Sequence, residues 1–247
     1  MSTAIRYLPV VLLFSFWELA SRMGWVSSDV LPAFSDVLIK WWQLLRSGDL
    51  VKHAFASLWR ESAGLGMSIV VGVALGIVMA VSKPLERLFQ PFVMFFYPLP
   101  KSALIPVIII WFGLGHLAQI AVIFLGCLLP VILSSFNGAK GVDRVLVWSA
   151  QSLGASQRKI VWDVIIRAAL PEIFAGVRVA LALSFVLLVS AEMIGARQGM
   201  GYLIGFLGEQ GEYAGMFAGI FTLVAFGFTA DRLYLGLVRY VLRWREA

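Results

Sequence analysis

Six long apolar runs, separated by shorter charged stretches, dominate this sequence and limit what it can fold into. They cover approximately residues 5–20, 58–81, 88–112, 118–136, 174–195 and 216–238. A helix needs about 20 apolar residues to cross a bilayer, and most of these runs reach or approach that length. The chain is 60% hydrophobic and only 14% charged, whereas a soluble domain carries about a quarter charged residues. The sequence therefore predicts an all-α membrane protein with six transmembrane helices.

The N-terminal region is expected to form a first span followed by a segment at the membrane surface. Residues 5–20 lack the small-residue cleavage site of a signal peptide, so we interpret them as an uncleaved span. Residues 27–56 mix tryptophans with charges, which is typical of a helix at the lipid headgroups. On this basis residues 1–57 form an N-terminal unit, residues 58–240 a five-helix core, and residues 241–247 a basic cytoplasmic tail.

The basic residues lie mainly at the ends of the apolar runs. The formal net charge is +6, and this placement follows the positive-inside rule, so it indicates a bilayer and not nucleic acid as the partner. The connections after the second and fourth runs and the C-terminal tail hold the strongest basic clusters. We therefore expect a multi-pass protein of the cell inner membrane with both termini in the cytoplasm. The long first loop does not follow the rule, because it would lie outside and yet contains five basic residues: Arg22, Lys40, Arg46, Lys52 and Arg60.

The third apolar run is broken by Pro98, Pro100 and Pro106 and contains Lys101. At membrane depth, such residues are tolerated only where the helix faces protein or a water-filled cavity. Tyr97 and Lys101 therefore mark a candidate translocation pathway, in which Lys101 would favour an anionic solute by Coulomb attraction. The alternative is a structural lysine whose side chain extends along the broken helix.

Two further charged residues, Arg178 and Glu192, lie inside the fifth run. Fourteen positions separate them, which is ~21 Å along a helix, so they cannot pair with each other and each needs its own partner. We assign Glu192 to the candidate pathway, as an external gate or as a tie between helices.

The sequence contains no motif of a familiar catalytic or metal site. The phosphate loop GxxxxGK[ST], the GxSxG elbow and the HExxH pair are all absent, so the chain is not expected to be an enzyme. The single cysteine, Cys127, excludes an intrachain disulfide, and His53 and His116 are isolated, so no metal site is expected. A channel or secondary transporter working alone is the alternative, although the internal repeat typical of many secondary transporters is not visible.

Residues 145–176 form a charged interruption between two apolar runs. Its basic residues are Arg158, Lys159 and Arg167, with Arg144 just before it. Such a segment is costly in hydrocarbon, yet Leu146, Ala150 and Leu153 recur at helical spacing. Gly154 would let the chain turn after this helix, and Ser156 would cap the next one. The pattern predicts a cytoplasmic helical loop with an apolar docking face.

This segment resembles a motif of a known family. The run WSAQSLGA at 148–155, followed by Leu170 and Pro171, is similar to the E-A-A-x-x-x-G motif of inner-membrane permease subunits of binding-protein-dependent ABC importers. Other segments resemble the branch with nitrate, bicarbonate, taurine, alkanesulfonate and pyrimidine-precursor permeases: LPAFSDVL (31–38), ASLWR (56–60), YPLPKSALIPVIIIWFGLG (97–115), AEM (191–193) and GMGYLI (199–204). Two positions depart from the pattern, because Trp148 and Arg167 stand where the family usually has Glu and Pro.

The resemblance implies a type I ABC importer permease fold in which the 145–153 segment is the coupling helix that docks on the ATPase. The docking residues would be Leu146, Trp148, Ala150, Leu153, Gly154 and Ala155. The implied partners are an ATP-binding subunit, which would hold ATP and Mg while this chain holds no cofactor, a second permease subunit expected to be identical, and an extracytoplasmic solute-binding protein. The implied solute is a small anion (sulfonate, taurine, nitrate or bicarbonate) or a pyrimidine precursor, moved by alternating access.

Overall fold

Helices account for all the regular secondary structure in residues 3–245, the part of the chain that the computed structural model describes; side chains are described from residue 8 to residue 244. The N-terminal half contains α1 (Thr3–Arg22), α2 (Phe34–Ser47), α3 (Asp49–Val81), α4 (Lys83–Phe96), η1 (Lys101–Leu104), α5 (Ile105–Phe112) and α6 (His116–Lys140). The second half contains α7 (Arg144–Ser152), α8 (Gln157–Ile160), the π-helical η2 (Val161–Ile165), α9 (Ile166–Gly195), α10 (Met200–Glu209), α11 (Tyr213–Val241) and η3 (Arg243–Arg245).

The lengths of these helices confirm the expected spans. Four continuous helices are long and apolar enough to cross a membrane: α3, α6, the helix over 157–195 that ends in α9, and α11. Helix α4 and the segment Lys101–Phe112, bent by 92° relative to each other, are long and apolar enough together to form a fifth, broken span. At 1.5 Å per residue, the 20 residues of α1 reach ~30 Å, which is the thickness of a bilayer core. The broken third span is thus found where the prolines predicted it.

One expected boundary is wrong. The surface segment expected over 27–56 contains α2 at 34–47, but α3 already begins at Asp49, because Gly48 adopts a left-handed conformation (φ 82°) that ends α2 and begins α3. Residues 49–56 are therefore the first two turns of the second span, and Arg60 lies inside that span, not in a loop. Between the fifth and sixth apolar runs lies the ten-residue helix α10, whose apolar residues Leu203, Ile204 and Leu207 are buried.

The core lies where α3, α6 and α9 pack against one another. Small residues allow this close approach. A Cβ atom added to Gly64 or Gly72 would lie within 2.8 Å of Ile123 or Val131 on α6, and one added to Gly76 would lie 2.6 Å from the Ile132 carbonyl oxygen. The glycines of the second span therefore pack helices, as the sequence predicts.

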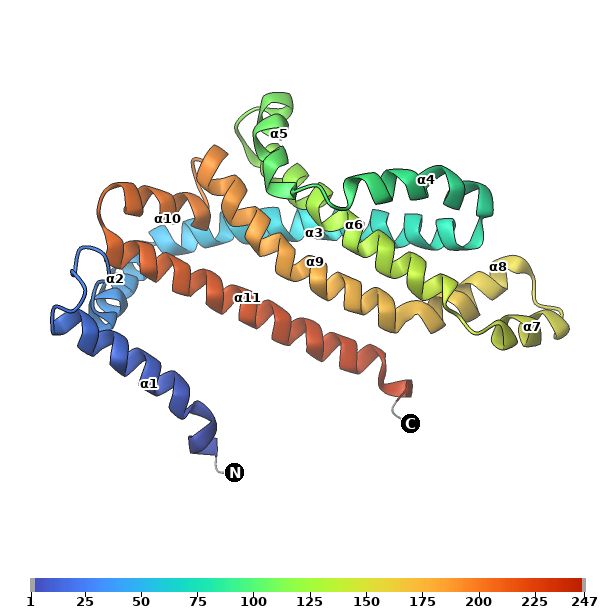
Figure 1. Cartoon of the computed structure of the whole chain (residues 1–247), viewed down its shortest axis with the longest axis horizontal. Helices are drawn as coiled ribbons and strands as arrows, with labels where there is room; N and C mark the ends of the chain where they lie inside the picture. The colour runs from blue at the N-terminus through green and yellow to red at the C-terminus, as the bar shows by residue number, and fades with distance from the viewer. Residues whose placement is uncertain (1–2, 246–247) are drawn as a thin grey trace.

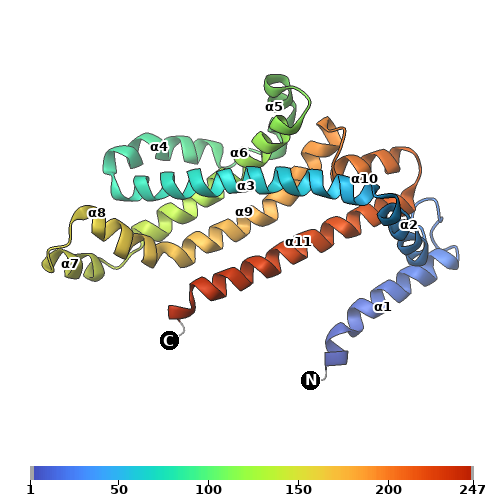
Figure 2. The same cartoon turned by 180° about the vertical axis from the view of Figure 1, so that it is seen from behind.

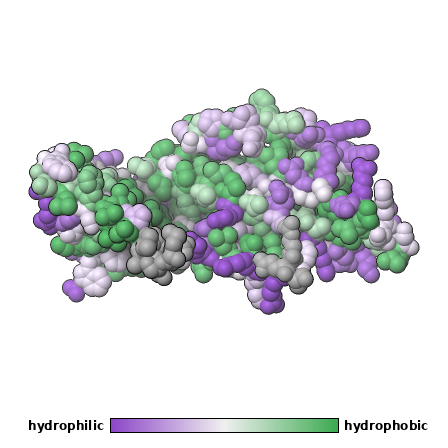
Figure 3. Space-filling model, turned by 60° about the horizontal axis from the view of Figure 1, so that its bottom comes forward, coloured by the Kyte–Doolittle hydropathy of each residue, from purple (hydrophilic) through white to green (hydrophobic). Residues whose placement is uncertain are grey.

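The long helices run roughly along one axis of the molecule (Figures 1 and 2). The α7 and α8 segment lies at one end, while α2 and α10 lie at the other (Figure 1). Hydrophobic residues cover much of the face shown in Figure 3, and hydrophilic ones are densest toward the end that carries α7 and α8. In the predicted basic tail, Arg243–Arg245 form a short 3-10 turn after α11, and residues 246–247 lie outside the described part.

Candidate coupling and translocation sites

The predicted turn after the docking helix is present. Asp143 caps α7 by accepting the N–H of Val145 at 2.9 Å. Gly154 adopts φ +77°, a conformation that favours glycine, and donates its N–H to the Gln151 carbonyl at 2.9 Å. Ser156 then caps α8 by accepting the N–H of Lys159 at 3.4 Å. Helix α7 therefore has a fixed beginning and a fixed end.

The apolar side chains of α7 are open to a partner. Leu146, Trp148 and Leu153 are 50%, 59% and 88% exposed, and α7 has no buried residue. Ala150 and Ala155 are half-buried. The stripe of Leu146, Ala150 and Leu153 is thus not covered by this chain's own helices.

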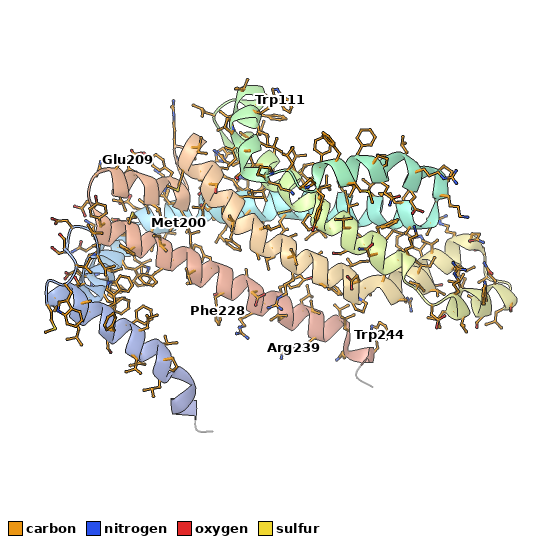
Figure 4. All side chains as sticks on the ribbon, in the orientation of Figure 1. Trp111, Met200, Glu209, Phe228, Arg239 and Trp244 are labelled. Atoms are coloured by element: carbon orange, nitrogen blue, oxygen red, sulfur yellow. The ribbon has the colours of Figure 1, made fainter. Side chains whose placement is uncertain are left out.

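A groove of about 690 Å³ lies beside this helix, between α7 and the C-terminus. It is lined by Leu146, Asp163, Val164, Arg167, Ala168, Leu170 and Trp244. Arg167, at the position where the family motif has Pro, pairs with Asp163 at 3.5 Å across one helical turn. Phe228 and Arg239 on α11 and Trp244 on η3 follow one another toward this end of the molecule (Figure 4).

Tyr97 and Lys101 lie together at the break in the third span. Tyr97 ends α4, and the Lys101 side chain folds back so that Nζ donates to the Tyr97 carbonyl and lies 5.5 Å from the centre of the Tyr97 ring. Lys101 is half-buried, whereas Tyr97 is 57% exposed. Pro106 lies in the first turn of α5, where its missing N–H costs nothing.

Glu192 lies apart from this pair, in a buried polar cluster. The Glu192 carboxylate is fully buried and accepts the Ser57 hydroxyl at 2.8 Å and the Gly201 N–H at 2.9 Å. Arg60, only 3% exposed, donates from Nη1 to the same carboxylate at 2.6 Å. A Cβ atom on Gly199 would lie 2.3 Å from this carboxylate, so glycine is required there. The cluster ties α3, α9 and α10 together, which agrees with Glu192 as a tie between helices.

Arg178 has a separate partner, as its distance from Glu192 requires. Its guanidinium donates two hydrogen bonds, at 2.7 and 3.0 Å, to Asp231 on α11. The sequence did not reveal Ser57, Arg60 or Asp231 as partners, since nothing in one sequence pairs charges on different helices. The one feature of the sequence that could have pointed to these residues is that each is a polar side chain in or beside an apolar run. Among the described side chains, no three His, Cys, Asp or Glu groups gather as a metal ion would require.

Comparison with known proteins identifies the family. Residues 72–243 match the family described as binding-protein-dependent transport system inner membrane component. The SsuC protein of Escherichia coli strain K12, named for aliphatic sulfonates transport, is 36% identical over 98% of this chain and 91% of its own length. The taurine transport system permease protein TauC of the same strain is 33% identical over 95% of this chain and 87% of its own length.

The fold is also found in a solved structure. A chain of the MetNI methionine ABC transporter in an inward-facing conformation superposes with a TM-score of 0.68, at 19% identity over 79% of this chain and 97% of that chain. The six-span architecture is therefore the type I ABC importer permease fold. From the match over residues 72–243 and the identity with whole permeases, this chain belongs to the inner-membrane components of binding-protein-dependent transport systems, as the membrane-spanning permease subunit of an ABC importer.

Proposed function

We propose that this permease conducts a small organic anion of the sulfonate class, with taurine among the candidates. Two relatives at 36% and 33% identity are named for aliphatic sulfonates and taurine. Lys101, half-buried at the break in the third span, supports the choice of an anion. Of the solutes implied by the sequence resemblance, nitrate, bicarbonate and pyrimidine precursors rank below sulfonates, because the relatives named for sulfonate and taurine are more similar than the formylaminopyrimidine permease ThiX at 28% identity.

Energy for transport would come from a partner ATPase that binds ATP and Mg, so that this chain contributes no catalytic group. The observation that carries this proposal is α7, an exposed apolar helix fixed at both ends by the Asp143 cap and the Gly154 turn. A helix docked in a groove transmits motion only if its register is fixed. Leu146, Ala150 and Leu153 would enter the ATPase groove, with Gly154 and Ala155 beneath them, and Trp148 would contact its rim.

The assembly would contain two copies of this permease, two ATPase subunits and an extracytoplasmic binding protein. Both termini would lie in the cytoplasm, on the side of α7. The basic residues support this orientation, since those at the α7 end include Lys83, Arg87, Lys140, Arg144, Arg158 and Lys159. The first loop contains fewer exposed basic residues than the sequence suggests, because Arg60 is buried inside α3 and paired with Glu192. Its departure from the positive-inside rule is therefore smaller.

Coupling is tested with Leu153→Asp and Gly154→Asp in the complete importer in nanodiscs. Both place a carboxylate on a surface that must become dry, which is costly without a partner charge. We expect ATP hydrolysis to lose its stimulation by the loaded binding protein while the permease stays inserted. Gln157→Asp, an exposed substitution on α8 and outside the docking residues, is the matched control and should retain stimulation. Normal stimulation in both test variants would reject the coupling role.

A further inference from the structure

A polar cavity of about 200 Å³ lies at the joint between the α5–α6 turn and the segment that links α9 to α10. It is lined by Arg60, Leu114, Gly115, His116, Gln119, Gly195, Ala196, Arg197 and Gln198. No carboxylate is among these residues, although two arginines are. The α5–α6 turn and the α9–α10 link lie away from the end that carries α7 and α8 (Figure 1), and no residue of α7 or α8 lines the cavity, so it is separate from the coupling surface.

Arg60 presents unused hydrogen-bond donors to this cavity. Its Nε donates to His116 Nδ1 at 3.0 Å, and its Nη1 donates to Glu192 and to the Gln198 carbonyl, each at 2.6 Å. No hydrogen bond from Nη2 is found among the described residues, and Arg60 is one of the residues that line the cavity. A guanidinium held on one side by a carboxylate is a rigid donor on the other.

His116 and the start of α6 add further donors. Because His116 Nδ1 accepts from Arg60, its proton is on Nε2, which is left as a donor on an exposed side chain. Helix α6 begins at His116 without a side-chain cap. The first N–H groups of a 25-residue helix are therefore free, and the helix dipole favours negative charge there.

Two polar groups at the cavity have no partner in the described part of this chain. Gln119 is 1% exposed and donates its Nε2 to the Gly195 carbonyl at 2.9 Å, but its Oε1 has no hydrogen-bond partner among the described residues. A buried amide oxygen needs a donor, and a water that donates to Oε1 can donate its second hydrogen to an anion. The Arg197 side chain lines the cavity, is exposed and forms no ion pair with the described residues.

We propose that this cavity binds a small oxyanion, such as a sulfonate or sulfate head group. The anion would accept from Arg60 Nη2, from His116 Nε2 and from the first N–H groups of α6, with Arg197 closing the mouth and a water bridging to Gln119. Glu192 lies behind Arg60 and does not line the cavity, so it orients the guanidinium and does not contact the ligand. The site is argued from the donors of the cavity alone and does not depend on which solute the importer carries.

The test measures the thermal unfolding midpoint of the permease–ATPase complex in neutral-lipid nanodiscs, without ATP or binding protein, against sodium ethanesulfonate, with sodium chloride at the same ionic strength. A ligand that binds the folded state stabilises it by RT ln(1 + [L]/Kd), so the midpoint rises with ligand concentration. We expect ethanesulfonate to raise it and chloride not to. Arg197→Gln removes a positive charge at an exposed position that lines the cavity and should raise the apparent Kd by about two- to fivefold.

Arg46→Gln is the matched control, because Arg46 is also an exposed arginine but lies on α2 and does not line the cavity. It should bind ethanesulfonate as the unmodified protein does. Gln119→Leu, which removes the buried acceptor, should weaken binding even where sulfonate uptake is unaffected. An equal response to chloride, or an unchanged Kd in Arg197→Gln, would overturn the site. If the importer does not transport sulfonates but ethanesulfonate still raises the unfolding midpoint, the proposed solute is wrong and the anion site is still supported.

Discussion

At the scale of single residues, Lys101 is the position where the identity of the solute is most directly testable. Replacing it with alanine removes a half-buried positive charge from the broken span. At ~4 Å, such a charge attracts an anion by about 4 kcal/mol at an effective dielectric constant of 20, so loss of the contact should reduce anion uptake at least about tenfold. The measurement is uptake of anionic and neutral candidate solutes into proteoliposomes containing the complete importer.

Lys101→Arg keeps the charge and is the matched control, so it should preserve most anion uptake. The local contact of Lys101 with the Tyr97 carbonyl is a structural role that both substitutions disturb. An equal loss for anionic and neutral solutes in Lys101→Ala would therefore mean that the lysine only supports the bend.

Residue positions also show what one sequence can and cannot reveal. The spacing of Arg178 and Glu192 was enough to show that they need separate partners, because helical rise is fixed. Which partners they have depends on how helices lie beside each other. Arg60 is 132 positions from Glu192, and Asp231 is 53 positions from Arg178. No local pattern connects such distant side chains, so the buried cluster was invisible in the sequence.

At the scale of elements, the contact between α3 and α6 depends on individual glycines. In Gly76→Ala, the new Cβ would lie 2.6 Å from the Ile132 carbonyl oxygen, and a backbone atom cannot move aside as a side chain can. The helices must separate, which should lower the free energy of unfolding by about 1–3 kcal/mol. Gly66→Ala, on the same helix, meets no atom within 4 Å and should stay within about 0.5 kcal/mol of the unmodified protein. Unfolding in a detergent titration compares the two, and similar stabilities would show that α3 and α6 are not packed this closely.

The elements themselves were predictable where a single local signal determines them. Apolar length located the spans, prolines located the bend at 97–100, and Gly154 with Ser156 located the α7–α8 turn. The sequence failed where two signals compete. Glycines at 199, 201, 205 and 208 favour a loop, yet α10 forms because Leu203, Ile204 and Leu207 are buried against neighbouring helices. Tertiary burial here outweighs the low helix propensity of glycine.

At the scale of the whole molecule, the remaining question is which end faces the cytoplasm, and the buried cysteine makes it testable. Cys127 is fully buried in α6 and should not react with a membrane-impermeant maleimide. Labelling of a variant with one new cysteine therefore reports on that cysteine, and the unmodified chain gives the background. Gln157 on α8 and Glu209 on α10 are exposed and lie at opposite ends of the molecule (Figures 1 and 4). If the basic α7 end is cytoplasmic, as charge placement favours, Glu209→Cys is labelled in cells whose inner membrane is intact. Gln157→Cys is then labelled only after that membrane is opened. The reverse pattern would place α7 outside, where no ATPase could reach it, and would contradict both the orientation and the coupling role together.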